Sequence, residues 1–138
     1  MNILKVLTDK RIKGNIGEDA AARYLKRRLF RILERNYVAN GHEVDIIATN
    51  RRYLCFVEVK TRTVSEGAAS YQRPAAAVTT EKMRSLISVA RSYLYANPTK
   101  KMIRFDVAEI YLAKDKSVTD INYIEGAFTR DDASTGRK

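Results

Sequence analysis

Apolar residues recur along the chain at spacings that predict two helices. From Asn15, which can cap a helix, apolar side chains return every three or four positions to about Phe30, while the opposite face is basic. A second helix is expected to follow a Thr79 cap and to run to about Ala96, because Asn97-Pro98 would stop it. Each helix has one apolar face, so we expect both to pack against a sheet.

Five strands are expected between and after these helices. Residues 31–39 and 43–49 should pair as a hairpin, because an Asn-Gly turn signal separates them. The third strand, 53–61, is apolar on both faces, which predicts a central position in the sheet. Two further strands are expected at 103–112 and at about 121–127. The order α-β-β-β-α-β-β predicts an α/β fold in which helices flank one central mixed sheet.

The length of 138 residues is that of a single domain. We expect a basic N-terminal arm at 1–13, one domain at 14–128 and a flexible polar tail at 129–138. Between these elements, the stretch 63–77 loses all periodicity and becomes rich in Ser, Gly, Ala and Gln. Connections of that length without secondary structure are often functional.

The charge of the chain favours a polyanionic partner. Lys and Arg number 26 against 16 acids, a formal net charge of +10, and nucleic acid is the expected partner. The alternative is that the basic residues only keep the surface soluble. No apolar run approaches the ~18 residues of a membrane span, so no membrane association is expected. The lone cysteine, Cys55, fits a small core residue in a reducing compartment, and the N-terminus does not fit a signal peptide, so we expect a cytoplasmic protein.

Acidic residues and a lysine stand inside two of the most apolar stretches of the chain. Asp45 lies in the second predicted strand, and Glu58 and Lys60 share one face of the third. The short turn between these strands should bring Asp45 close to Glu58. Two carboxylates and a backbone carbonyl, for which Val59 is suitably placed, suffice as protein ligands for Mg²⁺. The sequence therefore predicts a divalent-metal site beside Lys60, which would orient a water molecule or help neutralise an attacked phosphate.

Several motifs in the chain resemble the YraN-like bacterial family. The matching segments are Gly14-x-x-Gly17-Glu18, Glu43-Val44-Asp45-Ile46-Ile47-Ala48, Phe56-Val57-Glu58-Val59-Lys60-Thr61-Arg62, Val78-Thr79 with Lys82, Arg104-Phe105-Asp106 and the stretch from Ile124 to Phe128. That family is similar to archaeal Holliday-junction resolvases and belongs with the PD-(D/E)xK nucleases of restriction-endonuclease-like fold. The resemblance covers roughly residues 10–128.

The resemblance implies a restriction-endonuclease-like core and a set of catalytic residues. It implies Asp45 and Glu58 as metal ligands, Lys60 as the catalytic lysine, and Glu18 as an additional acid from the first helix. The implied activity is a structure-selective nuclease, dependent on Mg²⁺ or Mn²⁺, that hydrolyses phosphodiester bonds in branched or single-stranded DNA. A homodimer is the assembly that the resemblance suggests. The chain departs from the family at His42, where Gly is usual.

Each candidate also has a structural explanation. Glu18 stands three residues after Asn15 and would complete a capping box. Asp45 or Glu58 would form a buried ion pair with Lys60, although desolvation offsets much of the attraction in such a pair. The alternative function is therefore a non-catalytic nucleic-acid-binding accessory protein of the same fold, and a protein-interaction module is a third possibility.

Basic residues around the predicted site are expected to contact phosphates. The candidates are Arg23, Arg27, Arg62, Arg73 and Lys82. Such contacts give affinity rather than sequence preference and weaken with salt. Gln72 and Lys82 could serve as auxiliary polar residues at the site, although a solvated loop and an exposed helix turn are simpler explanations. Asp106, inside a later strand, is explained most simply by an ion pair with Arg104 or another arginine.

Overall fold

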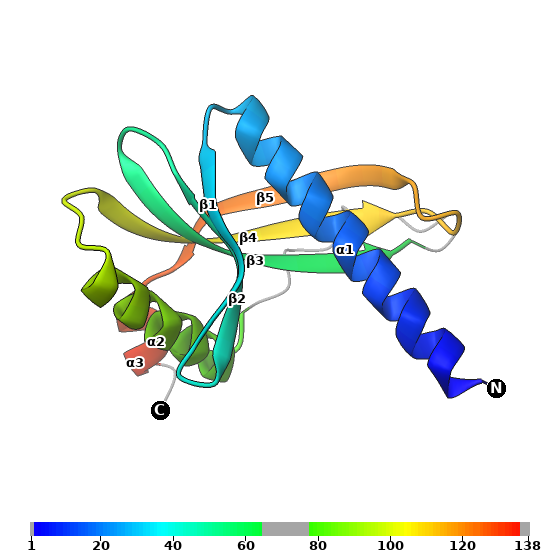
Figure 1. The fold of residues 1–138 in the computed structure, drawn as a ribbon, viewed down its shortest axis with the longest axis horizontal. Helices are drawn as coiled ribbons and strands as arrows, with labels where there is room; N and C mark the ends of the chain where they lie inside the picture. Colours follow the sequence, from blue (N-terminus) through cyan, green and yellow to red (C-terminus); the bar gives the residue numbers. More distant parts are fainter. Residues whose placement is uncertain (1, 65–77, 136–138) are drawn as a thin grey trace.

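The computed structural model describes residues 2–64 and 78–135, which form one five-stranded sheet with helices on both faces (Figure 1). The elements are α1 (Ile3–Arg27), β1 (Arg31–Ala39), β2 (His42–Thr49), β3 (Tyr53–Thr63), α2 (Thr80–Ala96), β4 (Met102–Leu112), β5 (Val118–Phe128) and α3 (Arg130–Thr135). The predicted α/β order is confirmed and agrees with a restriction-endonuclease-like core. None of the helices in the described ranges combines the length and apolarity that crossing a membrane requires.

The sheet has the strand order β1-β2-β3-β4-β5 and is mixed, as predicted. β3 lies at its centre, antiparallel to β2 and parallel to β4. The hairpin between β1 and β2 turns at Asn40 and Gly41, whose φ angles of 56° and 74° suit a tight hairpin turn. A parallel pair needs a crossover connection, and α2 supplies it between β3 and β4.

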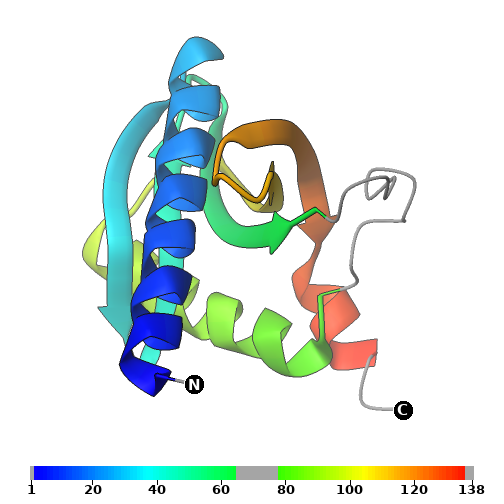
Figure 2. The same ribbon diagram turned by 90° about the vertical axis from the view of Figure 1, so that its right-hand side faces the viewer.

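The two faces of the sheet bury separate apolar cores. Under α1 the buried residues are Ala20, Ala21, Ala22, Leu25, Ile46, Ala48, Cys55, Val57, Ala108, Ile110 and Leu112. Under α2 and α3 they are Val44, Ile47, Leu54, Phe56, Leu86, Ile87, Val89, Ala90, Tyr93, Phe105, Phe128 and Ala133. Figure 2 shows α3 lying against α2, away from α1. Cys55 is therefore the small core residue that the sequence predicts.

α1 approaches β3 so closely that only glycine fits at one position. A Cβ atom on Gly17 would collide with the hydroxyl of Thr61 and lie 3.1 Å from its Cβ. Gly17 is buried in the middle of the helix, where glycine normally costs about 1 kcal/mol relative to alanine. The glycine therefore serves helix–sheet packing, and it holds the α1 backbone near the end of β3 that carries Glu58.

The prediction of a basic N-terminal arm at 1–13 is wrong, because residues 3–13 belong to α1. α1 begins at Ile3, where the side chain of Asn2 accepts a hydrogen bond from the Leu4 N–H at 3.0 Å. Asn15 is thus an interior residue rather than a cap. The early turns contain good helix formers, and Asp9 ties them to the β4–β5 turn through Lys116 at 2.9 Å. Figure 1 shows this half of the helix projecting beyond the sheet.

The prediction of a flexible tail at 129–138 is also wrong for residues 130–135, which form α3. α3 begins after Thr129, whose N–H donates to the Asp132 carboxylate at 2.7 Å. The Thr129 hydroxyl accepts from the Asp132 N–H at 3.4 Å, so the two residues form a reciprocal cap. Ala133 is buried in the core under α2. The sequence analysis overlooked this capping pair, and residues 136–138 lie outside the described part.

Candidate functional site

The predicted carboxylates meet where β2 and β3 stop pairing. The antiparallel ladder runs from Thr49 opposite Leu54 to Ile46 opposite Val57 and ends there. Beyond its end, the Asp45 carboxylate accepts a hydrogen bond from the Val59 N–H at 2.7 Å. A side chain thus replaces the backbone acceptor that a continued β2 strand would have offered.

A local distortion of β1 and β2 gives Asp45 this position. Val44 and Ile46 are two residues apart, yet they are buried in the cores on opposite faces of the sheet. Regular alternation would place both on one face, so the pleat is broken at Asp45. In the neighbouring strand Asn36 has a φ of 52°, between the paired residues Arg35 and Tyr37. Asp45 therefore lies at the strand edge beside β3, a position that alternation does not predict.

Glu58 is the second carboxylate of the site. The register that pairs Ile46 with Val57 brings Asp45 next to Glu58, and burial and then the charge of Glu58 raise the pKa of Asp45 from 3.8 to about 7. Glu58 is only 13% exposed, and its carboxylate pairs with the Lys82 ammonium at 3.4 Å. The hydrogen bond from Val59 and the charge of Lys82 oppose the rise in the pKa of Asp45. Two carboxylates and the ammonium of Lys82 thus converge, whereas the prediction placed Lys60 beside the acids.

Glu18 brings a third carboxylate from α1. It accepts a hydrogen bond from the Asn36 side chain at 3.1 Å, and Arg35 lies 3.7 Å away. Burial, followed by the charges of Asp45 and Glu43, raises the pKa of Glu18. Asn15 lies inside the helix, so the proposed capping role of Glu18 is wrong. Across residues 2–64 and 78–135, however, no three His, Cys, Asp or Glu side chains are arranged to hold a metal, so Glu18 stands beside the pair rather than completing it.

Val59 and Lys60 follow Glu58 directly on β3. Their predicted roles, a metal-binding carbonyl and a catalytic lysine, stay predictions. The N–H and carbonyl of one strand residue point to the same side, so the Val59 carbonyl shares the edge at which its N–H meets Asp45. Lys60 is half-buried on β3, two residues after Glu58. The ammonium that contacts Glu58 belongs to Lys82, in the first turn of α2. The sequence predicted Lys82 as a phosphate contact, an auxiliary polar residue at the site or a solvated residue, and not as the partner of Glu58.

The other predicted phosphate contacts are dispersed. Arg23 and Arg27 are exposed on α1, and Arg62 is exposed near the end of β3. Arg73 and Gln72 lie outside the described residues. Arg35 was overlooked, although it binds the Asp19 carboxylate at 2.8 Å beside Glu18.

Asp106 is structural, as the simpler interpretation predicted. Its fully buried carboxylate receives two hydrogen bonds from Arg104, at 2.9 and 3.0 Å. The Tyr123 hydroxyl donates at 2.7 Å and the Gly126 N–H at 2.9 Å. The Arg104 guanidinium also lies 4.5 Å from the centroid of the Tyr53 ring. These partners account for this buried charge without a catalytic role.

Comparison with known proteins places these residues in a family. The model of an uncharacterised protein family, UPF0102, matches residues 17–110. The chain belongs to the UPF0102 family. A UPF0102 protein of Caldicellulosiruptor saccharolyticus is 40% identical over 121 residues, covering 87% of this chain and 99% of the relative. Another, from Acetivibrio thermocellus, is 38% identical over 125 residues, covering 87% and 93%.

Membership in UPF0102 confirms the resemblance to the YraN-like family. A third relative, the UPF0102 protein of Chlorobium phaeobacteroides strain BS1, is 46% identical over 98 residues, covering 70% of this chain and 75% of its own. The range matched by the family model contains Glu18, Asp45, Glu58 and Lys60. The whole candidate site therefore lies in the part of the chain that defines UPF0102.

Proposed function

We propose that this UPF0102 protein is a metal-dependent nuclease that hydrolyses phosphodiester bonds in branched DNA, in the manner of Holliday-junction resolvases. The observation that carries the proposal is the convergence of the Asp45 and Glu58 carboxylates at the end of the β2–β3 ladder. Adjacent half-buried carboxylates repel each other, and a fold retains them at a cost to stability. A divalent cation would relieve that repulsion.

The donor set at this position fits Mg²⁺ or Mn²⁺. Asp45, Glu58 and the Val59 carbonyl would supply hard oxygen ligands, and Mg²⁺ keeps several waters in addition to one or two carboxylates. When bound, such an ion activates water and stabilises charge on an attacked phosphate. Lys82 and Lys60 would hold phosphate oxygens near the pair. Glu18, next to Asp45, would orient the attacking water.

The charge distribution supports a nucleic-acid substrate. The net charge of +10 includes the exposed side chains of Arg23, Arg27 and Arg62, together with Arg73. Contacts from these residues to phosphates would add affinity that falls steeply with salt. Without a bound cation, the carboxylates would repel a polyanion. In this proposal the metal ion neutralises the carboxylates and the basic surface attracts the phosphates.

Cleavage assays with charge-matched variants test the proposal. Labelled four-way junction, flap, single-stranded and duplex DNA are incubated with the protein and Mg²⁺ or Mn²⁺. We expect junction cleavage that EDTA stops and that Asp45→Asn and Glu58→Gln each reduce to background. Asp120→Asn, an acid-to-amide change at an exposed residue of β5, should cleave like the wild type. Failure of the wild-type protein to cleave any of these substrates would refute the proposal.

A second candidate is a nucleic-acid-binding accessory protein without turnover. It is favoured by the contacts that satisfy both acids within the protein, namely the Val59 N–H on Asp45 and the Lys82 ammonium on Glu58. Salt-sensitive DNA binding that EDTA leaves unchanged, with no cleavage, would select this candidate.

A further inference from the structure

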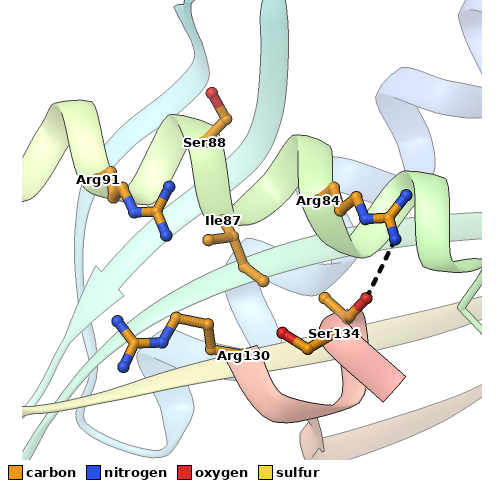
Figure 3. A pocket seen from close by; sticks show the side chains of 7 residues that line it. Arg84, Ile87, Ser88, Arg91, Arg130 and Ser134 are labelled. Carbon is orange, nitrogen blue, oxygen red and sulfur yellow. Dashed lines mark hydrogen bonds between the residues drawn. The ribbon is translucent and has the colours of Figure 1, made fainter. Parts of the chain in front are cut away.

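Two cavities adjoin between α2, α3 and the start of β4. One has a volume of about 300 Å³ and is lined by side chains of α2 and α3 (Figure 3). The other, also about 300 Å³, extends from α2 and α3 to β4 and the end of β5. Ile87, Arg91 and Arg130 line both cavities and so mark their junction.

The first cavity gathers three guanidinium groups. Arg91 of α2 and Arg130 of α3 extend on the same side of Ile87, while Arg84 lies on the other side (Figure 3). Arg84 donates to the Ala133 carbonyl at 3.4 Å. In the described part of the chain, no carboxylate forms an ion pair with any of these arginines. Uncompensated like charges repel, and the arginine fork matches the oxygens of a phosphate, so the cavity suits a phosphate anion.

The second cavity is apolar. Its apolar lining residues are Ile87, Ala90, Leu94, Ile103, Phe105 and Phe128. The rings of Phe105 and Phe128 are stacked, with centroids 4.8 Å apart, and form part of its wall. Its volume and apolar lining suit a flat group such as a nucleobase. The two cavities together therefore complement a phosphate with a base attached to it.

This location is separate from the carboxylate pair. Lys82 contacts Glu58 from α2, whereas Arg84 and Arg91 are turned about 200° and 180° around the helix from Lys82. The arginines consequently face away from Glu58, toward α3. A ligand in these cavities would leave the candidate metal site open.

We propose that the cavities between α2 and α3 bind one nucleotide unit of a nucleic-acid strand, its phosphate on Arg91 and Arg130 and its base in the apolar cavity. The inference rests on the proposed function only in taking nucleic acid as the partner, and it requires no cleavage. The net charge of +10 favours a polyanionic strand over an isolated anion. Arg84 would add a further contact to the phosphate or to its neighbour along the strand.

Binding measurements with four probes test this site. The probes are inorganic phosphate, 2-deoxyribose 5-phosphate, dAMP and a 5′-phosphorylated single-stranded 12-mer, measured by calorimetry without divalent metal. We expect dAMP to bind roughly tenfold more tightly than 2-deoxyribose 5-phosphate, because the base enters the apolar cavity. The 12-mer should bind more tightly still. Arg91→Gln and Arg130→Gln should each weaken 12-mer binding and lower its salt slope by about one.

The matched control is Lys114→Gln, which removes one positive charge from the exposed β4–β5 turn. If Lys114→Gln and Arg91→Gln lose equal affinity for the 12-mer, the proposed site is refuted, because charge alone would then explain binding. A 12-mer that binds no more tightly than dAMP would overturn the assignment to a strand. An acidic peptide of equal charge that displaces dAMP equally well would overturn the nucleotide assignment. A protein that binds in this way but does not cleave DNA refutes the nuclease proposal alone.

Discussion

The Asp45 carboxyl group should make the folded protein less stable at neutral pH than an uncharged side chain would. Burial and the charge of Glu58 raise its pKa from 3.8 to about 7. The folded protein therefore holds this proton more tightly than the unfolded chain, and the free energy of unfolding falls as the pH rises from about 4 to about 7. A difference of about 3 pH units corresponds to ~4 kcal/mol. The group keeps some solvent contact, so we expect roughly half of this, ~2 kcal/mol.

Asp45→Asn isolates this effect because the amide oxygen can still accept the hydrogen bond from Val59. In EDTA, the variant should exceed the wild type by ~2 kcal/mol in free energy of unfolding at pH 8 and equal it near pH 4. Urea denaturation, followed by circular dichroism at several pH values, measures the free energy of unfolding of the variant and of the wild type. Asp120→Asn should stay within about 0.5 kcal/mol of the wild type throughout.

Addition of Mg²⁺ extends the same experiment. An ion that binds only the folded state stabilises it by mass action, so Mg²⁺ should stabilise the wild type and leave Asp45→Asn unchanged. A variant that is less stable than the wild type at pH 8, or a difference that does not change with pH, would refute the electrostatic reasoning. Equal stabilisation of both proteins by Mg²⁺ would refute the assignment of Asp45 as a ligand.

Three further predictions concern packing and buried groups. Gly17→Ala should lower the free energy of unfolding by about 2 kcal/mol, because its Cβ collides with Thr61, and Thr61→Ala should restore part of the loss in thermal denaturation. Asp106→Asn should lower the free energy of unfolding, measured by urea denaturation, by about 3–5 kcal/mol, because the Arg104 charge then lacks its buried partner. A variant as stable as the wild type would contradict this. Burial and then the charge of Asp106 raise the pKa of Cys55 to about 12, so a thiol reagent at pH 8 should react only after unfolding, and fast reaction of the native protein would disprove its burial.

Periodicity and turn residues were sufficient to predict the sheet and the pairing of β2 with β3, although not the broken pleat at Asp45. The short turn after β2 fixes the register in which Ile46 faces Val57, and this register carries Asp45 to Glu58. The partner of Glu58 was not predictable in this way. Lys82 lies on the crossover helix, and its approach depends on how α2 packs on the sheet rather than on any local pattern.

The error at the N-terminal end has a tertiary cause. Helix formers continue upstream of Gly14, and the interaction of Asp9 with Lys116 joins segments far apart in the sequence. Gly14 and Asn15 are typical of a helix start, but the contact of Asp9 with Lys116 supports the helix upstream of them, and the local sequence does not predict that contact. The broken pleat at Asp45 lies opposite the left-handed backbone of Asn36, which no turn signal in the sequence marks.

The parallel pairing of β3 with β4 has a consequence for how the chain reaches this fold. Each residue of β3 meets a partner about fifty positions further along the chain, and such non-local pairing slows folding. During synthesis the first three strands emerge before β4, which leaves the apolar edge of β3 exposed for a time. Conditions that slow elongation beyond β3 should therefore favour aggregation of nascent chains.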